Sequence, residues 1–462
     1  MRWTGGRVAV AGACAVLVGA AAVGGGMVLT GRDPAAGADA APAATASPTP
    51  SPLVTPTPVL AAPAAGQAQT AAGTATALAG PLSDDRLGPR VSAVVLDADS
   101  GQVLLDRGSG TFVIPASTAK LATSVALLAV TEPDQRLTTT VVAGATPGEV
   151  VLVGGGDATL SGAPAGQSTA YEGAARISTL AAAARKAGAA KVTKVVVDGS
   201  LFPGPAMAPS WDPRDVNGGY ITPISAAMVD GGRQEGLRAR SAAPDLQAGR
   251  ALAVALGVPK AAVVRGKAPA GAATLATVES QPIPRLVEQM LLASDNVLAE
   301  ALARQVAVAE GQPAGFPGAA AATRTVLGRL GLPAGGDRLV DGSGLSLQDR
   351  VTPALLAGLL RVAAGPADPR LHALVPGLPV SGYIGTLDDR FRTGPAALAA
   401  GEVRAKTGTL DGVSSLAGLV RGAGGRLLAF AVVADRVPAG GTRPAEAALD
   451  EVAAALARCP CR

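Results

Sequence analysis

Two side chains three positions apart could activate a serine for nucleophilic attack. Ser117 and Lys120 form an SxxK motif, followed by apolar residues at helical spacing, Leu121, Val125 and Leu128. Residues i and i+3 share a helix face, so the Lys120 amine can reach the Ser117 hydroxyl. A neutral amine would take the serine proton, and a helix N-terminus favours the negative charge that develops. The motif predicts a serine nucleophile, although the same spacing also occurs by chance in many helices.

A second motif, Ser294-Asp295-Asn296, lies within 291–302. The Ser294 hydroxyl could relay a proton to a leaving group, and the Asn296 amide could hold the lysine amine and a substrate amide. By itself, SDN is also typical of the polar face of an ordinary helix.

A third motif, KTGT, lies on a strand predicted to begin near Val403. Lys406 can bind a carboxylate, and its positive charge favours the neutral form of a nearby lysine. Gly408 would let a substrate backbone approach the strand closely. The Thr407 and Thr409 hydroxyls can hold a terminal carboxylate. The backbone N–H groups of Thr409 and of the nucleophilic serine could form an oxyanion hole.

The order of the three motifs is more informative than any one of them. The chain contains only seven lysines, and two of them, Lys120 and Lys406, lie in these motifs. SxxK, SDN and KTG in this order are the signature set of penicillin-interacting serine acyltransferases.

Over about residues 78–458 the chain resembles the D-alanyl-D-alanine carboxypeptidase/endopeptidases of the class C low-molecular-mass penicillin-binding proteins. Further segments carry the resemblance: the GGGD turn at 154–157, DGSLF at 198–202, YITPISA at 220–226, DGSGLS at 341–346 and LPVSG at 378–382. Many such families have a basic residue directly after DGSGLS, where this chain has Leu347. That departure bears on recognition of the stem peptide rather than on the core chemistry.

The resemblance implies an α/β (α+β) serine DD-peptidase/β-lactamase-like fold, with an antiparallel sheet flanked by helices and a mainly β inserted domain. It implies cleavage of D-Ala-D-Ala termini or D-Ala cross-links of peptidoglycan through an acyl-enzyme at Ser117. β-Lactams would react covalently at the same serine, and no metal or organic cofactor is needed. Leu345 and Ser346, in the DGSGLS loop, would contact the substrate.

Two other hypotheses remain open. One is a β-lactamase or D-amino-acid esterase on the same fold, disfavoured because no ExxLN motif is present and because 177 positions separate Ser117 from Ser294. That spacing leaves room for the family's insertion. The other is a non-catalytic peptidoglycan-binding protein, which would be expected to have lost signature residues that this chain retains.

Hydrophobic patterning and turn residues predict the elements that position the motifs. Hairpins are expected over 91–105 and 416–433, around Asp/Ser/Gly-rich and Gly-rich turns, and a helix after Pro444. Between the two hairpins, over about residues 138–275, the sequence pattern instead predicts short strands, turns and an Ala-rich helix near 178–187. The predicted layout is a DD-peptidase domain in two parts, 81–137 and 276–462, that encloses an inserted domain at 138–275.

The N-terminal segment predicts delivery to the cell envelope. Residues 1–32 contain an uncharged run of 23 residues, Val8–Thr30, preceded by Arg2 and Arg7. We favour a retained membrane anchor, with a cleaved signal peptide as the alternative. Residues 33–80, rich in Ala, Pro and Thr, predict a disordered tether that extends the catalytic domain away from the membrane.

Composition excludes several classes. Aromatic residues make up 2% of the chain and its net charge of +4 is unclustered, which argues against nucleic-acid binding. The single histidine, His372, rules out an HExxH motif or a His-rich metal site. Cys459 and Cys461 could form a small disulfide ring or remain thiols, and neither is expected to be catalytic.

Overall fold

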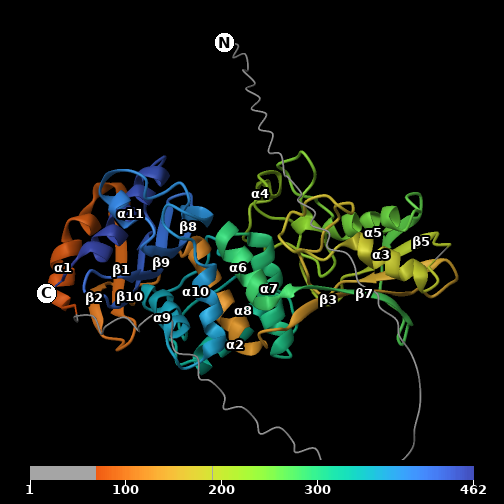
Figure 1. Cartoon of the computed structure of the whole chain (residues 1–462), viewed down its shortest axis with the longest axis horizontal. Coiled ribbons are helices and arrows are strands. Elements are labelled where there is room, and N and C mark those ends of the chain that lie inside the picture. Colours follow the sequence, from red (N-terminus) through yellow and green to blue (C-terminus); the bar gives the residue numbers. More distant parts are fainter. Residues whose placement is uncertain (1–68, 190, 462) are drawn as a thin grey trace, which may run out of the picture. The chain divides into compact units, whose positions relative to one another are not determined.

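The computed structural model describes residues 69–189 and 191–461. Its first sheet is antiparallel with strand order β2-β1-β10-β9-β8 (Figure 1). The strands are β1 (Val91–Asp97), β2 (Val103–Arg107), β8 (Val403–Leu410), β9 (Val413–Arg421) and β10 (Leu427–Ala434). The two predicted hairpins, β1–β2 and β9–β10, are confirmed. β8, which carries KTGT, is an edge strand.

Helices cover both faces of this sheet, which explains why β9 and β10 are buried at nearly every position. α11 (Thr442–Arg458) packs on β9, and α9 (Pro353–Ala364) packs on β10 and β1. A strand buried on both faces has no solvent side on which to place polar residues. The helix predicted after Pro444 is α11, with Pro444 in its first turn.

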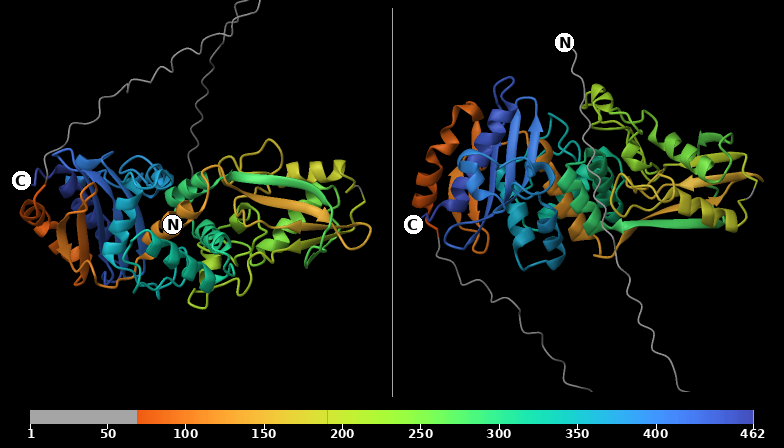
Figure 2. Two further views of the ribbon diagram at one scale, coloured as in Figure 1. Left: turned by 90° about the horizontal axis from the view of Figure 1, so that it is seen from below. Right: turned by 45° about the horizontal axis from the view of Figure 1, so that its top comes forward.

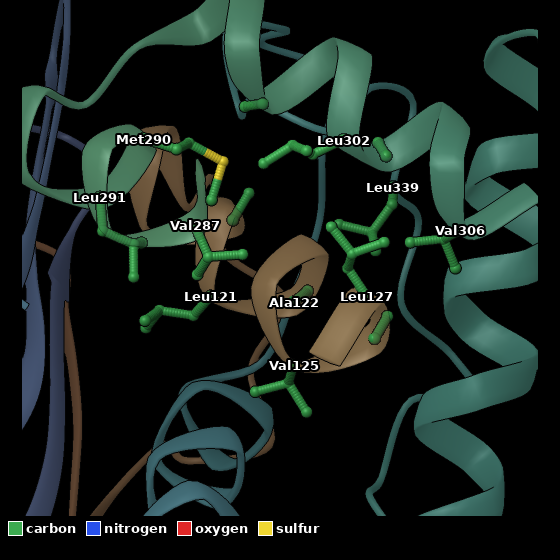
Figure 3. Packing of buried hydrophobic residues seen from close by; sticks show 14 of the residues in the cluster. Leu121, Ala122, Val125, Leu127, Val287, Met290, Leu291, Leu302, Val306 and Leu339 are labelled. Carbon is green, nitrogen blue, oxygen red and sulfur yellow. The ribbon is translucent and has the colours of Figure 1, made fainter. Parts of the chain in front are cut away.

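A helical layer follows the first sheet and carries the largest apolar core. It contains α2 (Lys120–Val130), α6 (Ile283–Ala293), α7 (Asn296–Ala309), α8 (Phe316–Arg329) and the short α10 (Leu374–Gly377). Figure 3 shows Leu121 and Leu127 of α2 among Met290 of α6 and Leu302 of α7. α2 is apolar around almost its whole circumference because sheet, helices and loops surround it.

The second sheet has strand order β6-β5-β4-β3-β7, antiparallel across β4-β3-β7 and parallel across β4-β5-β6. Its strands are β3 (Arg136–Ala143), β4 (Glu149–Val153), β5 (Lys194–Asp198), β6 (Ala262–Arg265) and β7 (Thr274–Pro282). α3 (Ile177–Lys186) and α5 (Pro244–Ala255) pack on it, and α4 (Arg214–Asn217) lies in a long loop. Figure 2 shows this sheet on the far side of the helical layer from the first sheet.

The chain enters and leaves the second sheet through neighbouring strands. β3 comes shortly after α2, and β7 runs directly into α6. β3 and β7 pair antiparallel, with Arg136 opposite Pro282. The segment between the SxxK and SDN motifs therefore begins and ends at one place, beside the helices that carry those motifs.

The N-terminal boundary of the folded region differs from the sequence prediction. Residues 71–79, which composition placed in the tether, form helix α1 (Ala71–Ala79), and Leu78 is fully buried. Thr70 caps this helix, and its N–H donates to the Cys461 carbonyl 2.7 Å away. Cys459 and Cys461 form a disulfide, so the C-terminal ring supports the start of α1. A single apolar side chain in an Ala/Thr-rich segment was too weak a signal to predict this packing.

The predicted anchor at 1–32 and most of the predicted tether lie outside the described residues. Among the helices that the structure does describe, none has the length and apolarity needed to span a bilayer.

Candidate active site

Ser117 lies in a 3₁₀ turn, Ala116–Ala119, that continues directly into α2, so Lys120 is the first residue of the α-helix. Lys120 is fully buried, and its Nζ lies 2.9 Å from Ser117 Oγ. The i, i+3 spacing thus brings the two side chains together as the sequence predicts. Ala116 has a left-handed φ of 49°, and this bend precedes the serine.

Two further oxygens surround the Lys120 amine. Nζ donates to Asn296 Oδ1 and to the Ser343 carbonyl, each 2.7 Å away. A neutral amine has two hydrogens and one lone pair, so these two acceptors leave the lone pair for the Ser117 hydroxyl. Burial lowers the pKa of Lys120 to about 8, despite opposing carboxylates of which Asp341 is the strongest. The environment therefore favours the form of the lysine that can accept a proton.

The SDN motif forms the break between two helices rather than a helix face. Ser294 ends α6 in the left-handed conformation, with φ of 52°, and Asp295 caps α7 by accepting from Leu298 N–H. Asn296 is then the first residue of α7 and points its amide at Lys120. The break turns Ser294 toward the KTGT strand, where its Oγ lies 2.9 Å from Lys406 Nζ.

Lys406 is fully buried on β8, and its Nζ also donates to the Thr407 carbonyl 2.8 Å away. Burial lowers the pKa of Lys406 well below its usual value, and the nearby Lys120 and Arg390 add to that shift. Because the two lysines disfavour each other's charge, a proton on one promotes the neutral form of the other.

Gly408 allows the strand and the Ser117 turn to meet. A Cβ at Gly408 would lie 2.7 Å from the Pro115 carbonyl and 3.1 Å from Ser117 N, and closer still to Ser415 Oγ. The sequence indicated that this glycine makes room for a substrate backbone. The structure shows that the protein's own nucleophile turn uses that space.

The KTGT hydroxyls have partners in two other segments. Thr407 Oγ1 lies 2.8 Å from Thr386 Oγ1, and Thr409 Oγ1 donates to Glu446 Oε1 at 2.8 Å. Glu446 lies in the first turns of α11, 37 positions beyond Thr409. Sequence reasoning missed Glu446 because no local pattern distinguishes it from other charged residues of an amphipathic helix.

The motifs open into one cavity of about 800 Å³. Ser117, Ser294, Thr407 and Thr409 line one end of it. Beyond Thr409, which contacts Glu446 of α11, the lining continues along α11 and the segment 389–394.

The DGSGLS loop contributes differently from the sequence prediction. Ser346 is fully buried, and its Oγ donates to Ser210 Oγ. Leu345 is half-buried and packs against the helical core. Neither is among the residues that line the cavity in the described structure. The loop instead presents the Ser343 carbonyl to Lys120, a contact through the backbone that residue types alone could not reveal.

Three buried carboxylates hold that loop in place. Glu300 Oε1 accepts from Gly342 N–H at 2.9 Å, and Asp341 accepts from the backbone of 343, 344 and 346. Asp349 accepts from Val340 N–H. Burial and the neighbouring Asp341 raise the pKa of Glu300 to about 7, although Arg304 opposes this shift. The negative charge beneath Lys120 is therefore partly neutralised near neutral pH.

Loops of the inserted segment also reach the site. Asp295 accepts from Tyr171 Oη at 2.9 Å and from Arg233 Nη2 at 2.6 Å, while Arg240 lies 3.5 Å away. Burial alone would raise the pKa of Asp295, but the Arg240 and Arg233 guanidiniums outweigh it and hold this pKa well below its usual range. Asn296 Nδ2 donates to the Tyr220 carbonyl at 3.1 Å.

In the part of the chain that the structure describes, no group of three or more His, Cys, Asp or Glu side chains is arranged to hold a metal ion.

A buried lysine beside a serine at a helix start, a second serine at a helix break and a lysine on an edge strand define a penicillin-interacting serine hydrolase. Comparison with known proteins agrees. The model of the D-Ala-D-Ala carboxypeptidase 3 (S13) family matches residues 74–236 and 233–456, and the chain belongs to this family. The resemblance to D-alanyl-D-alanine carboxypeptidases that the motifs indicated is thereby confirmed. The assignment of the chain as a serine-type D-Ala-D-Ala carboxypeptidase is confirmed as well.

Two relatives match most of the chain. Carboxypeptidase DacB of Mycolicibacterium smegmatis is 45% identical over 399 residues, covering 85% of each protein. Carboxypeptidase Rv3627c of Mycobacterium tuberculosis is 44% identical over 402 residues, again covering 85% of each. Among solved structures, penicillin binding protein 4 (dacB) of Haemophilus influenzae superposes with a TM-score of 0.66 at 22% identity, covering 82% of this chain and 97% of that one. The last comparison confirms the predicted fold.

Proposed function

We propose that Ser117 attacks the carbonyl of the penultimate D-Ala in a peptidoglycan stem peptide. The leaving group is the terminal D-Ala, or a second stem peptide where the bond is a cross-link. Water then hydrolyses the acyl-enzyme. The placement of the Lys120 amine carries this proposal. Asn296 Oδ1 and the Ser343 carbonyl accept its two hydrogens, and its lone pair is left for the Ser117 hydroxyl.

The proton follows a short route. It passes from the Ser117 hydroxyl to Lys120 as the Oγ–carbon bond forms, and the oxyanion is stabilised by the N–H groups of Ser117 and Thr409. Ser294, held by Lys406, relays the proton: it donates its own proton to the departing amine as the C–N bond breaks and takes the proton from Lys120 in its place, which leaves both groups neutral. The edge position of β8 supports this pose, because an edge strand leaves alternate backbone groups free for a substrate backbone.

We further propose that β-lactams acylate Ser117. A β-lactam carbonyl presents the same electrophile to the same nucleophile, and the similar Haemophilus influenzae protein is named for penicillin binding. Membership of this family supports a location in the cell envelope, where peptidoglycan lies. The charge pattern of residues 1–32 supports a membrane anchor with the catalytic domain outside the cytoplasm.

Replacement of the nucleophile tests the proposal. We expect Ser117→Ala to lose the penicillin adduct in intact-mass analysis and to lower D-Ala release by at least about 10⁴-fold. Ser168→Ala, an exposed serine of the insertion, is the matched control and should retain both. An adduct that persists on Ser117→Ala would place the nucleophile elsewhere. Rapid turnover of penicillin without D-Ala release by the unaltered protein would favour the β-lactamase hypothesis.

A further inference from the structure

The cavity continues beyond the residues that the core chemistry needs. From Ser117 and Ser294 it passes Thr407 and Thr409, which are proposed to hold the carboxylate of the leaving D-Ala, and extends to α11. Its far end therefore lies on the leaving-group side of the scissile bond. Sites of 300–1,000 Å³ are the size that encloses a drug-sized ligand. At about 800 Å³, this cavity is much larger than one alanine requires.

The walls of the far end are braced by ion pairs. Arg390 donates to Asp450 at 2.6 Å and to the Glu446 carbonyl at 2.8 Å, which ties the segment 389–394 to α11. Arg86 lies 3.0 Å from Glu451, the residue that follows Asp450 in α11. Thr409 joins β8 to Glu446. Because three segments are each linked to α11 in this way, the cavity is formed before any ligand enters.

Two further arginines line the same end, and both are exposed. The Arg392 guanidinium donates a hydrogen bond to the Asp388 carbonyl, and Arg443 lies in the first turn of α11. Among the described residues, neither takes part in a salt bridge, unlike Arg86 and Arg390 in the same wall. Arginine is well suited to bind carboxylates through two parallel N–H groups. These two side chains are thus available to an anionic ligand.

We propose that this end of the cavity, with Arg392 and Arg443, is a leaving-group subsite that binds carboxylates of a second stem peptide. The proposal rests on the proposed function, since it takes Ser117 as the nucleophile and the KTGT hydroxyls as the carboxylate site. A terminal D-Ala leaves the subsite empty, whereas the leaving half of a cross-linked dimer fills it. The two arginines therefore set the preference for cross-links over free termini.

The test compares two purified muropeptides with the full chain: a monomer ending in D-Ala-D-Ala and a D-Ala cross-linked dimer. We expect Arg392→Ala and Arg443→Ala each to lower kcat/KM on the dimer about tenfold more than kcat/KM for D-Ala release. The loss should fall mainly on KM, because these contacts are remote from the reacting atoms. Arg421→Ala, at the far end of β9, is the matched control and should leave the ratio of the two activities unchanged.

Each outcome separates the subsite from the catalytic proposal. Equal losses on both substrates, or no loss on the dimer, would overturn the subsite while leaving Ser117 as the nucleophile. An unaltered enzyme that releases D-Ala but does not cleave the dimer would do the same. Failure of both reactions in the unaltered enzyme would instead count against the proposed function. D-Ala release by each arginine variant reports directly that the variant has folded.

Discussion

The two five-stranded sheets of this protein differ in what is buried around them. Five charged residues are buried in the first sheet, in the helical layer or in the loop beside Lys120: Lys120, Lys406, Glu300, Asp341 and Asp349. In the second region, the pair Lys194–Glu149 within the sheet and the pair between Arg265 of β6 and Asp245 of α5 lie at or near the surface. Burying a charge costs several kcal/mol unless partners compensate it. The first region thus retains such charges where they shift the protonation of a catalytic lysine.

The second region nevertheless takes part in the site through its loops. Tyr171, Arg233 and Arg240 hold Asp295, and Trp211 Nε1 donates to Asp341 at 2.7 Å. Both carboxylates lie beside residues that contact Lys120. The insertion therefore supports the positions of Asn296 and Ser343, and we expect its removal to disturb the chemistry.

The largest effect should come from the buried lysine itself. Arginine keeps its proton at neutral pH, so we expect Lys120→Arg to be nearly as damaging as Lys120→Ala, with acylation slowed about 10³-fold. Rapid-mixing measurements of acylation by a fluorescent penicillin check this. Lys194→Arg, in the second sheet, should be silent. Acylation by Lys120→Arg within about tenfold of the unaltered rate would mean that charge alone suffices and that the base lies elsewhere.

The next effect concerns the contact between the two regions. Asp295→Asn leaves Arg240 nearly buried without its carboxylate, and we expect a loss of about 3–5 kcal/mol in the free energy of unfolding. Denaturant titration measures it. Asp245→Asn removes the partner of the exposed Arg265 within the insertion and should cost about 1 kcal/mol or less. If the two variants lost equal amounts of the free energy of unfolding, burial would not distinguish the Asp295 contacts from the surface pair.

A smaller loss should follow from changes to α1. Leu78 is fully buried against the first region, so we expect Leu78→Ala to cost about 2–4 kcal/mol of stability. Leu237→Ala, an exposed leucine of the insertion, should cost less than about 0.5 kcal/mol. A chain that starts at Gln69 should melt like the full chain, and one that starts at Pro81 should not. An unchanged melting temperature for the shorter chain would mean that α1 does not stabilise the first region.

The smallest effect sharpens the role of the carboxylates beneath Lys120. The acylation rate should rise with pH through about 8, as Lys120 loses its proton. The Glu300 carboxylate raises the pKa of Lys120, so Glu300→Gln should lower that pKa and move the rising limb to lower pH by about one unit or less. Rates of thioester hydrolysis between pH 5 and 9 would reveal the shift. A rising limb that moved to higher pH would show that Glu300 affects the pKa of Lys120 by holding the DGSGLS loop rather than by its charge.

Local sequence was sufficient for the parts of the site that depend on short spacing. Ser117 and Lys120 meet because i and i+3 share a helix face, and KTGT lies on a strand because β-branched and apolar residues surround it. The β1–β2 and β9–β10 hairpins follow from turn residues between apolar runs. The order of the three motifs then indicated the family, because each motif can be recognised from the sequence without knowledge of the fold.

Only the tertiary structure decided which distant groups surround those motifs. The Ser343 carbonyl reaches Lys120 across 223 positions, and Glu446 reaches Thr409 across 37. Ser346, expected in the substrate site, is instead buried against Ser210. Leu78, expected in a tether, is part of the core. These outcomes depend on how helices, strands and loops pack together. That packing is set by complementary shape and charge over the whole domain, and short-range patterns of residue type and spacing do not reveal it.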